Sequence, residues 1–294
     1  MIGSGLIFSP LLLFKGPLCV SLQVYILIMK SVKPKKNLGQ HFLTDTQIAR
    51  QIADTVDAYP GIPVLEIGPG MGVLTQFLAR KDRELKAVEI DFESVTYLNA
   101  HYPKLQNNII RDDFLRMDLG QVFDGREFVL TGNYPYDISS QIFFKMIAHK
   151  DLIPCCTGMI QREVALRLSS APGSKAYGIL SVLIQAWYDV EYLFTVDENV
   201  FNPPPKVKSA VVRMTRNGVK DLGCDEHLFK RVVKATFLHR RKMLRVSLRS
   251  LFQNGMPEAA FFARDMMTLR PEQLSIAQFV TLTNMVQEAL HKGD

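Results

Sequence analysis

The chain has 294 residues, of which 47% are hydrophobic and 22% are charged. This composition excludes a disordered chain, and the length allows one domain of about 200 residues with a smaller one beside it. The 35 Lys and Arg residues exceed the 29 Asp and Glu residues, and the pI of about 9.1 favours an anionic partner such as nucleic acid.

The first 29 residues form an apolar segment with almost no charge. Pro10, Lys15, Gly16 and Pro17 interrupt it, so neither part reaches the ~20 apolar residues that a spanning helix needs. No basic segment precedes the first apolar run, as it would in a signal peptide. We interpret residues 1–29 as a leader outside the fold, with a membrane anchor as the alternative.

The cysteines show no CxxC spacing. We therefore expect reduced, partly buried thiols in a cytoplasmic protein, with neither a metal site nor a disulfide. The four cysteines are Cys19, Cys155, Cys156 and Cys224.

A lysine-rich arm that includes Lys33 and Lys35 precedes the first predicted helix. A solvated tail is the usual explanation for such a cluster, and contact with RNA is the alternative. The segment Thr44 to Gln47 has the pattern of a capping box, which predicts a helix that runs to about Ala58.

A strand, a glycine loop and a helix follow, at residues 63–67, 68–72 and 73–80. The loop spacing G-P-G-M-G does not fit the dinucleotide pattern G-x-G-x-x-G, and Glu66 would repel a pyrophosphate. This disfavours an NAD-dependent dehydrogenase. A ligand with a positive sulfonium and an amino acid end suits the loop better.

Acidic residues lie at the carboxyl ends of three successive strands, predicted at 63–67, 85–90 and 108–111 with a helix at 92–100. Glu66 and Glu89 belong to the first two strands, and Asp113 follows the third. A carboxylate after the second strand can accept from two ribose hydroxyls, and one after the third from an adenine amino group. Together with the glycine loop, these acids predict a site for an adenosyl ligand.

The tetrapeptide Asn133, Tyr134, Pro135 and Tyr136 follows a short buried strand at 127–130. Ser139 then predicts a capped helix start. Ligands of open α/β sheets bind at this edge, and an amide acceptor, a stiff proline and an aromatic face suit chemistry on the amino group of adenine. A proline turn with two surface tyrosines is the alternative.

The next segment continues the α/β pattern. We predict a final antiparallel pair around residues 190–194 and 207–212, joined through Phe201 and three consecutive prolines. The proline segment is a rigid loop, in which Phe201 is either a core plug or a stacking platform. The other predicted elements are helices at 138–148, 162–168 and 178–187 and a strand at 155–161.

The pattern becomes helical after about residue 217. We predict one long helix whose apolar face carries Phe229, Val233, Phe237, Leu244 and Leu248. No acid occurs between positions 226 and 258, so the eight Lys and Arg residues there favour phosphate binding over a solvated face. The basic residues proposed to contact RNA are Lys234, Arg240, Arg241, Lys242, Arg245 and Arg249.

Six motifs stand out along the chain: Leu38 to Leu43, Glu66 to Gly70, Glu89 to Asp91, Asn133 to Tyr136, Phe201 to Val207 and Arg240 to Arg245. In this order, they resemble the ribosomal RNA adenine N6-dimethyltransferase family, and within it the bacterial small-subunit enzymes. The similarity covers about Lys33 to Leu290. Two positions depart from the family pattern. The family often has Asn where this chain has His41, and often has Leu where this chain has Tyr134.

The resemblance implies a class I methyltransferase domain at residues 30–217, with a seven-stranded sheet between helices, and a helical RNA-binding domain at 218–294. The implied cofactor is S-adenosylmethionine, and the target adenosine would be flipped between Tyr136 and Phe201, where Asn133 and the Tyr134 carbonyl accept its amine hydrogens. The implied cofactor-binding residues are His41, Leu43, Glu66, Gly68, Gly70, Glu89, Ile90, Asp113 and Asn133.

By the same resemblance, the activity is N6,N6-dimethylation of two adjacent adenosines near the 3′ end of small-subunit (16S) RNA, during biogenesis of the small subunit. The partners would be this RNA and the pre-30S particle, with no membrane, no metal and a monomeric enzyme. The alternatives are a large-subunit adenine methylase of the resistance type, a DNA adenine methylase and a non-catalytic RNA-binding assembly factor.

Overall fold

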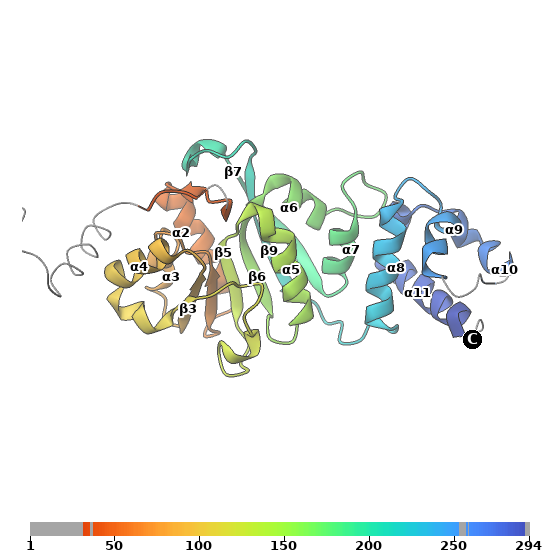
Figure 1. Ribbon diagram of the computed structural model, residues 1–294, viewed down its shortest axis with the longest axis horizontal. Helices are drawn as coiled ribbons and strands as arrows, with labels where there is room; N and C mark the ends of the chain where they lie inside the picture. The colour runs from red at the N-terminus through yellow and green to blue at the C-terminus, as the bar shows by residue number, and fades with distance from the viewer. Residues whose placement is uncertain (1–31, 36–37, 253–256, 258, 292–294) are drawn as a thin grey trace, which may run out of the picture.

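The computed structural model describes residues 32–35, 38–252, 257 and 259–291 (Figure 1). The predicted leader, and with it Cys19, lies outside these residues. Within the described ranges, no helix is long and apolar enough to cross a membrane. The three cysteines of these ranges are free thiols, with Cys155 and Cys156 buried and Cys224 partly buried.

The central sheet has seven strands: β2 (Val64–Ile67), β3 (Leu85–Glu89), β4 (Ile109–Arg111), β5 (Val129–Asn133), β6 (Cys155–Gln161), β7 (Tyr188–Val196) and β9 (Ser209–Arg216). Their spatial order is β4-β3-β2-β5-β6-β9-β7. The first five in this order are parallel, and β9 is antiparallel to both neighbours, which confirms the predicted final pair. Because β3 and β5 flank β2 on opposite sides, the order of the strands reverses at β2, where open α/β sheets bind ligands.

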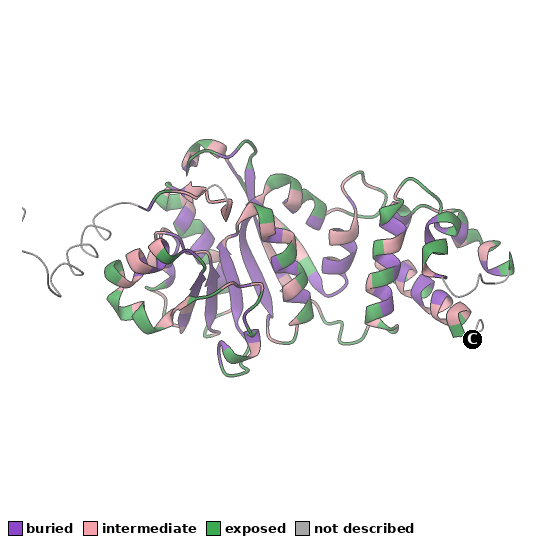
Figure 2. Cartoon of the chain, in the orientation of Figure 1, coloured by how far each residue is buried: buried purple, intermediate pink, exposed green. Residues whose placement is uncertain are grey.

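Helices cover both faces of this sheet. The helices α2 (Thr46–Asp54) and α3 (Thr75–Leu78) pack on one face, and α5 (Ser139–Ala148), α6 (Arg162–Leu168) and α7 (Ile179–Gln185) pack on the other, while α4 (Phe92–His101) contacts β3 and β4. On β5, Val129 belongs to the apolar cluster under α2 and α3, and Leu130 belongs to the apolar cluster under α5, α6 and α7. This is expected for strands that are buried on both faces. Figure 2 shows the strands buried along most of their length. The expected α/β architecture is confirmed.

Several predicted helix starts are wrong in detail. Asp45, and not Thr44, caps α2, because its carboxylate accepts from the amides of Gln47 and Ile48. The Thr44 hydroxyl instead donates to the Val200 carbonyl at 2.9 Å. Ser139 is the first residue of α5 and makes no side-chain cap. The helix predicted at 73–80 is reduced to the four residues of α3.

The proline segment is held by a two-stranded sheet of β1 (Phe42–Leu43) and β8 (Phe201–Asn202). In this antiparallel pair, Leu43 lies opposite Phe201. Phe201 is 4% exposed and belongs to the apolar cluster beneath α2. Its side chain therefore packs as a core plug.

The helical part contains α8 (Glu226–Leu238), α9 (Leu244–Ser247), α10 (Ala259–Phe262) and α11 (Ile276–His291). The single long helix predicted across residues 229–248 is wrong, because α8 ends at Leu238 and a turn precedes α9. Two long-range hydrogen bonds hold this break: Leu244 N donates to Leu269 O at 2.9 Å, and an Arg240 guanidinium nitrogen donates to Ser174 O at 3.2 Å. Both acceptors, Leu269 and Ser174, are far from the break in sequence.

Short 3₁₀ helices complete the described chain. They are η2 (Thr55–Ala58), η3 (Pro103–Asn108), η4 (Leu119–Gln121), η5 (Tyr136–Ile138), η6 (Glu198–Val200), η7 (Leu248–Leu251), η8 (Asp265–Thr268) and η9 (Pro271–Gln273).

The helical part docks on α7 and on the start of β7 through an apolar contact continuous with the core of the larger part (Figure 1). Trp187 packs edge to face against Phe229, with ring centroids 6.0 Å apart. Tyr177 packs similarly against Phe237 at 6.3 Å, and its hydroxyl donates to Leu274 O at 3.0 Å. These contacts hold the basic turn after α8 in a fixed position relative to the sheet.

Candidate active site

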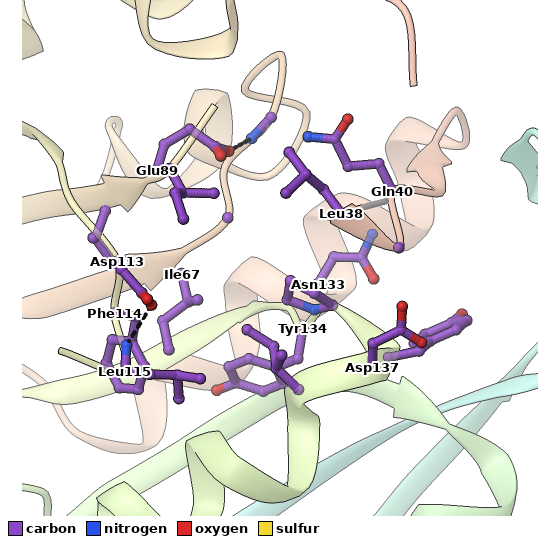
Figure 3. Close-up of a pocket in the computed structure, with 18 of the residues that line it drawn as sticks. Leu38, Gln40, Ile67, Glu89, Asp113, Phe114, Leu115, Asn133, Tyr134 and Asp137 are labelled. Atoms are coloured by element: carbon purple, nitrogen blue, oxygen red, sulfur yellow. Dashed lines mark hydrogen bonds between the residues drawn. The ribbon is translucent and has the colours of Figure 1, made fainter. Parts of the chain in front are cut away.

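A cavity of about 240 Å³ opens at the carboxyl edge of the parallel strands (Figure 3). Ile67, Glu89 and Asn133 line it from the ends of β2, β3 and β5, and Asp113 lines it from the loop after β4. The segment before β1 closes one side. The cavity therefore lies at the strand edge where the sequence predicted a ligand.

Glu89 is fixed by the backbone on both carboxylate oxygens. Oε2 accepts from Gly70 N at 3.1 Å, and Oε1 accepts from Asp91 N at 2.9 Å. Burial to 5% exposure raises the pKa of Glu89, while these backbone hydrogen bonds oppose the rise. The carboxylate is thus held at the cavity wall with lone pairs left to accept from hydroxyl groups of a ligand.

The glycine loop lies directly against β1, which follows the segment that closes the cavity. Gly70 has φ +55°, and a Cβ there would lie 2.9 Å from Cε1 of Phe42, so a larger residue would push this ring away. Gly68 also lines the cavity, with φ +63°. The loop is therefore shaped for close approach of backbone to neighbouring groups.

Glu66 lies beside a second, smaller cavity, together with Leu43, Gly68, Gly70 and Asn133. Its side chain is 1% exposed and accepts from Thr75 Oγ1 at 2.7 Å. Burial raises the pKa of Glu66 to about 8, and the charge of Glu89 adds to the rise while the Thr75 bond opposes it. With no ligand present, the Glu66 carboxyl group is therefore mostly protonated at neutral pH.

Asp113 lies in the wall of the main cavity, on the same side as Glu89 in Figure 3. Its Oδ1 accepts from Leu115 N at 2.9 Å (Figure 3), and its Oδ2 lies 3.5 Å from Nε of Arg116. Ile90 lines the same region and remains exposed, and Phe114 adds a buried ring. Acceptor oxygens between apolar walls suit an amine-bearing aromatic ring.

Asn133 ends β5 with its side chain at the cavity (Figure 3). Its Nδ2 donates to the His41 carbonyl at 3.1 Å. This bond fixes the amide orientation, and within the described residues no donor reaches Oδ1. The side chain therefore offers a free acceptor oxygen beside the cavity.

Tyr134 points its side chain into the core. Its hydroxyl donates toward the carbonyls of Leu130 and Thr157, at 3.2 and 3.0 Å. Gly158 makes room for the ring, since a Cβ there would lie 2.7 Å from Cε2 of Tyr134. The side chain is a structural anchor, so Tyr134 can serve the cavity through its main chain, while Pro135 lines the wall.

Tyr136 and His41 bring two rings to the rim of the cavity. They are stacked, with centroids 5.6 Å apart and an interplanar angle of 27°. The Tyr136 hydroxyl is hydrogen-bonded to Ser209 Oγ, and burial raises the pKa of this tyrosine. Phe201 is absent from the described residues that line the cavity and packs in the apolar cluster beneath α2.

The predicted basic residues do not lie on a single helix. Lys234 comes from α8, Arg245 from α9 and Arg249 from η7, and the other three lie in the turn between α8 and α9. Arg240 is half-buried by its bond to Ser174 O, whereas the other five are exposed. Within the described part of the chain, none of the six forms an ion pair.

The lysine arm is partly engaged within the protein. The Lys35 ammonium forms an ion pair with the buried Asp91 and lies 3.4 Å from Oε1 of Glu93. This ammonium is therefore already paired within the protein and is less available to RNA. The ion pair ties the segment before β1 to the start of α4.

Other lining residues were not singled out from the sequence. Most of them lie beside predicted site residues within the same motifs, so proximity to a motif was the signal that could have found them. Across the described ranges, no group of three or more His, Cys, Asp or Glu side chains is arranged to hold a metal ion. The additional lining residues are Leu38, Gly39, Gln40, Phe42, Ile67, Val88, Asp112, Phe114, Leu115, Asp137 and Ile138.

A family model described as ribosomal RNA adenine dimethylase matches residues 31–288. The chain belongs to this family. It is therefore a ribosomal RNA adenine dimethyltransferase, and the resemblance predicted from its motifs is confirmed.

Curated relatives of this dimethyltransferase match it over nearly their whole length. The ribosomal RNA small subunit methyltransferase A of Bacteroides thetaiotaomicron is 66% identical over 264 residues, which cover 89% of this chain and 97% of the relative. The protein of the same name from Flavobacterium johnsoniae is 52% identical over 260 residues, which cover 88% and 98%.

Solved structures show the same architecture. A dimethyladenosine transferase from Plasmodium falciparum has a TM-score of 0.69 at 23% identity and covers 86% of this chain and 98% of that one. The 23S rRNA methyltransferase ErmE has a TM-score of 0.59 at 26% identity and covers 84% and 99%. Together with the strand order, these likenesses show that the dimethylase has the class I methyltransferase fold that the sequence predicted.

Proposed function

We propose that this dimethyltransferase acts on the small-subunit (16S) RNA and dimethylates two adjacent adenosines near its 3′ end. The names of the curated relatives, at 52% and 66% identity, support this substrate. The chemistry is carried by one observation: the amide of Asn133 is oriented by the His41 carbonyl so that Oδ1 remains open beside the cavity.

The cavity fits S-adenosylmethionine. When bound, this cofactor supplies an electrophilic methyl group on a sulfonium. Glu89 would accept from the two ribose hydroxyls, and Asp113 would accept from the adenine amine between the side chains of Ile90 and Phe114. The cavity beside Glu66, Gly68 and Leu43 would take the cationic amino acid end.

The amino nitrogen of a target adenine is a weak nucleophile because its lone pair is delocalised into the ring. Asn133 Oδ1 and the Tyr134 carbonyl would accept the two amine hydrogens and so turn the lone pair toward the methyl group. Stacking of the flipped base on Tyr136 would hold the nitrogen in line. No strong general base is needed, because the proton can leave to solvent after transfer.

The basic turn and the helices beside it would bind phosphates of the RNA. The absence of ion pairs at these exposed side chains within the described residues supports this role, because a cluster of one sign is otherwise self-repelling. We infer that the enzyme works in the cytoplasm as a monomer, on the pre-30S particle during small-subunit biogenesis.

The decisive experiment measures transfer of labelled methyl groups from S-adenosylmethionine to undermethylated small subunits, with free large-subunit RNA as comparison. Wild type should produce dimethyladenosine in small-subunit RNA. Asn133→Ala should lower the rate by at least 100-fold, because it removes an acceptor that acts on the reacting nitrogen.

Asn284→Ala is the matched control. Asn284 lies on α11, and its Nδ2 also donates to a backbone carbonyl, that of Gly223, at 3.0 Å. This variant should retain the wild-type rate. Label found only in large-subunit RNA would instead identify a resistance-type methylase. Binding to RNA without any transfer would contradict the proposed reaction and favour an assembly factor.

A further inference from the structure

The ring that covers Tyr136 is His41. Their centroids lie 5.6 Å apart with an interplanar angle of 27°, which is within the range of an aromatic contact. Both residues line the main cavity, whereas Phe201 is buried under α2. One face of the Tyr136 ring, at this cavity, is thus already in contact with a side chain of the protein.

The imidazole is also anchored by a hydrogen bond to the proline segment. His41 Nδ1 lies 2.8 Å from the carbonyl oxygen of Pro203. Because a carbonyl can only accept, Nδ1 carries a hydrogen and donates it. The His41 side chain therefore joins the ring of Tyr136 to the proline segment after β8.

The main chain of His41 has a separate task. Its carbonyl accepts from Asn133 Nδ2 at 3.1 Å, and this bond does not involve the imidazole. The ring can therefore move while the carbonyl continues to orient the catalytic amide. Substitution of the side chain tests the ring alone.

The stacked pair leaves no room for a third ring. An adenine between two aromatic planes needs about 7 Å, twice the ~3.5 Å contact distance between carbon atoms. The observed 5.6 Å between centroids is smaller. A base can stack on this face of Tyr136 only after the imidazole has moved away.

We propose that His41 is a positioning residue whose imidazole occupies the target-base face of Tyr136 in the empty enzyme and is displaced when a flipped adenine enters. The inference deepens the proposed function and rests on Tyr136 as the stacking surface. The imidazole keeps the face covered until a base competes for it. It therefore sets how readily the enzyme accepts a flipped nucleotide.

The test places 2-aminopurine at one target adenosine of a small-subunit RNA fragment and measures its fluorescence at saturating enzyme, as a readout of base flipping. Removing the ring in His41→Ala removes the competitor. The flipped population and kcat/KM should then rise by about 2- to 10-fold, the factor that corresponds to one aromatic pair.

Two further variants separate the ring from the hydrogen bond. His41→Phe keeps a ring but loses the Nδ1 donor, so it should remain close to wild type in flipping. His41→Asn keeps a donor but has no ring, so it should resemble His41→Ala. The thermal midpoints of all three should stay near wild type, because His41 is only partly buried and its ring contact with Pro203 is exposed.

Lower flipping in His41→Ala would overturn the proposal, since it would make the imidazole a stacking partner of the base. Equal flipping in all variants would overturn it as well. A third outcome would assign the effect to the Pro203 bond instead of the ring. In that case His41→Asn would flip the base like wild type, and His41→Phe would flip it like His41→Ala. Failure of the wild type to methylate small subunits would count against the proposed function itself, whatever the variants do.

Discussion

The carboxyl group of Glu66 lies within the sheet, where Thr75 Oγ1 is its hydrogen-bond donor at 2.7 Å. Burial, opposed by this bond, raises its pKa to about 8 from an ordinary value of 4.5. Between these two pH values, the folded chain holds a proton that the unfolded chain has released. The contribution of Glu66 to stability is therefore complete below pH 4.5 and is lost as the pH rises through 8.

The ligand-free wild type should lose stability over this window by roughly 1.4 kcal/mol per pH unit from this group. The free energy of unfolding, measured by denaturant titration at several pH values between 5 and 8, checks the slope. Glu66→Gln replaces the protonated acid by a neutral amide of similar shape, so its slope should be flatter by that amount. Parallel slopes for the two proteins would show that Glu66 is already ionised in the fold.

At the scale of elements, the break between α8 and α9 decides where the basic side chains lie. Arg241 is exposed in the turn between them. Arg241→Ala should weaken binding to small-subunit RNA and should lower the slope of log K against log salt by about 0.7 to 0.9, the value for one phosphate contact. Filter binding or fluorescence anisotropy at several salt concentrations measures both quantities.

Arg50→Ala is the control for this prediction, because Arg50 is an exposed arginine on α2 whose guanidinium lies 3.9 Å from Asp54. It should leave the slope unchanged. An equal loss in both variants would mean that net charge, and not the turn, drives binding.

Elements fixed by local pattern were predictable, and those fixed by distant partners were not. Glu89, Asp113 and Asn133 could be placed together because parallel strands end at one edge of a sheet. The break after Leu238 could not be predicted, because no Gly or Pro marks it and because Leu244, which starts the next helix, donates to the carbonyl of the distant Leu269. The apolar spacing there fits a continuous helix equally well.

The position of Phe201 shows the same limit. An aromatic residue before three prolines fits either a core plug or a stacking platform, and only the pairing of Phe201 with Leu43 decides that it packs inward. The stacked pair of His41 and Tyr136 likewise joins segments that are far apart in sequence. Site residues supplied by strand ends were thus predictable, and those supplied by contacts between loops were not.

At the scale of the whole molecule, the two parts share one apolar core across the contact of Trp187 with Phe229. This geometry predicts that the helical part does not unfold independently. Trp187 is the single tryptophan of the chain and is fully buried at the junction, so its fluorescence reports docking directly. Denaturant unfolding followed by this fluorescence and by far-UV circular dichroism should give coincident transitions.

Phe229→Ala should destabilise the protein by about 3–5 kcal/mol, because it opens a cavity against Trp187 in a core that both parts share. Both probes should shift together to lower denaturant. Phe229→Leu retains most of the apolar volume and should cost less, roughly 1.5 kcal/mol or below. If the fluorescence transition of Phe229→Ala instead precedes the loss of helix signal, the two parts are separately stable, and the basic turn is not held rigidly against the active site.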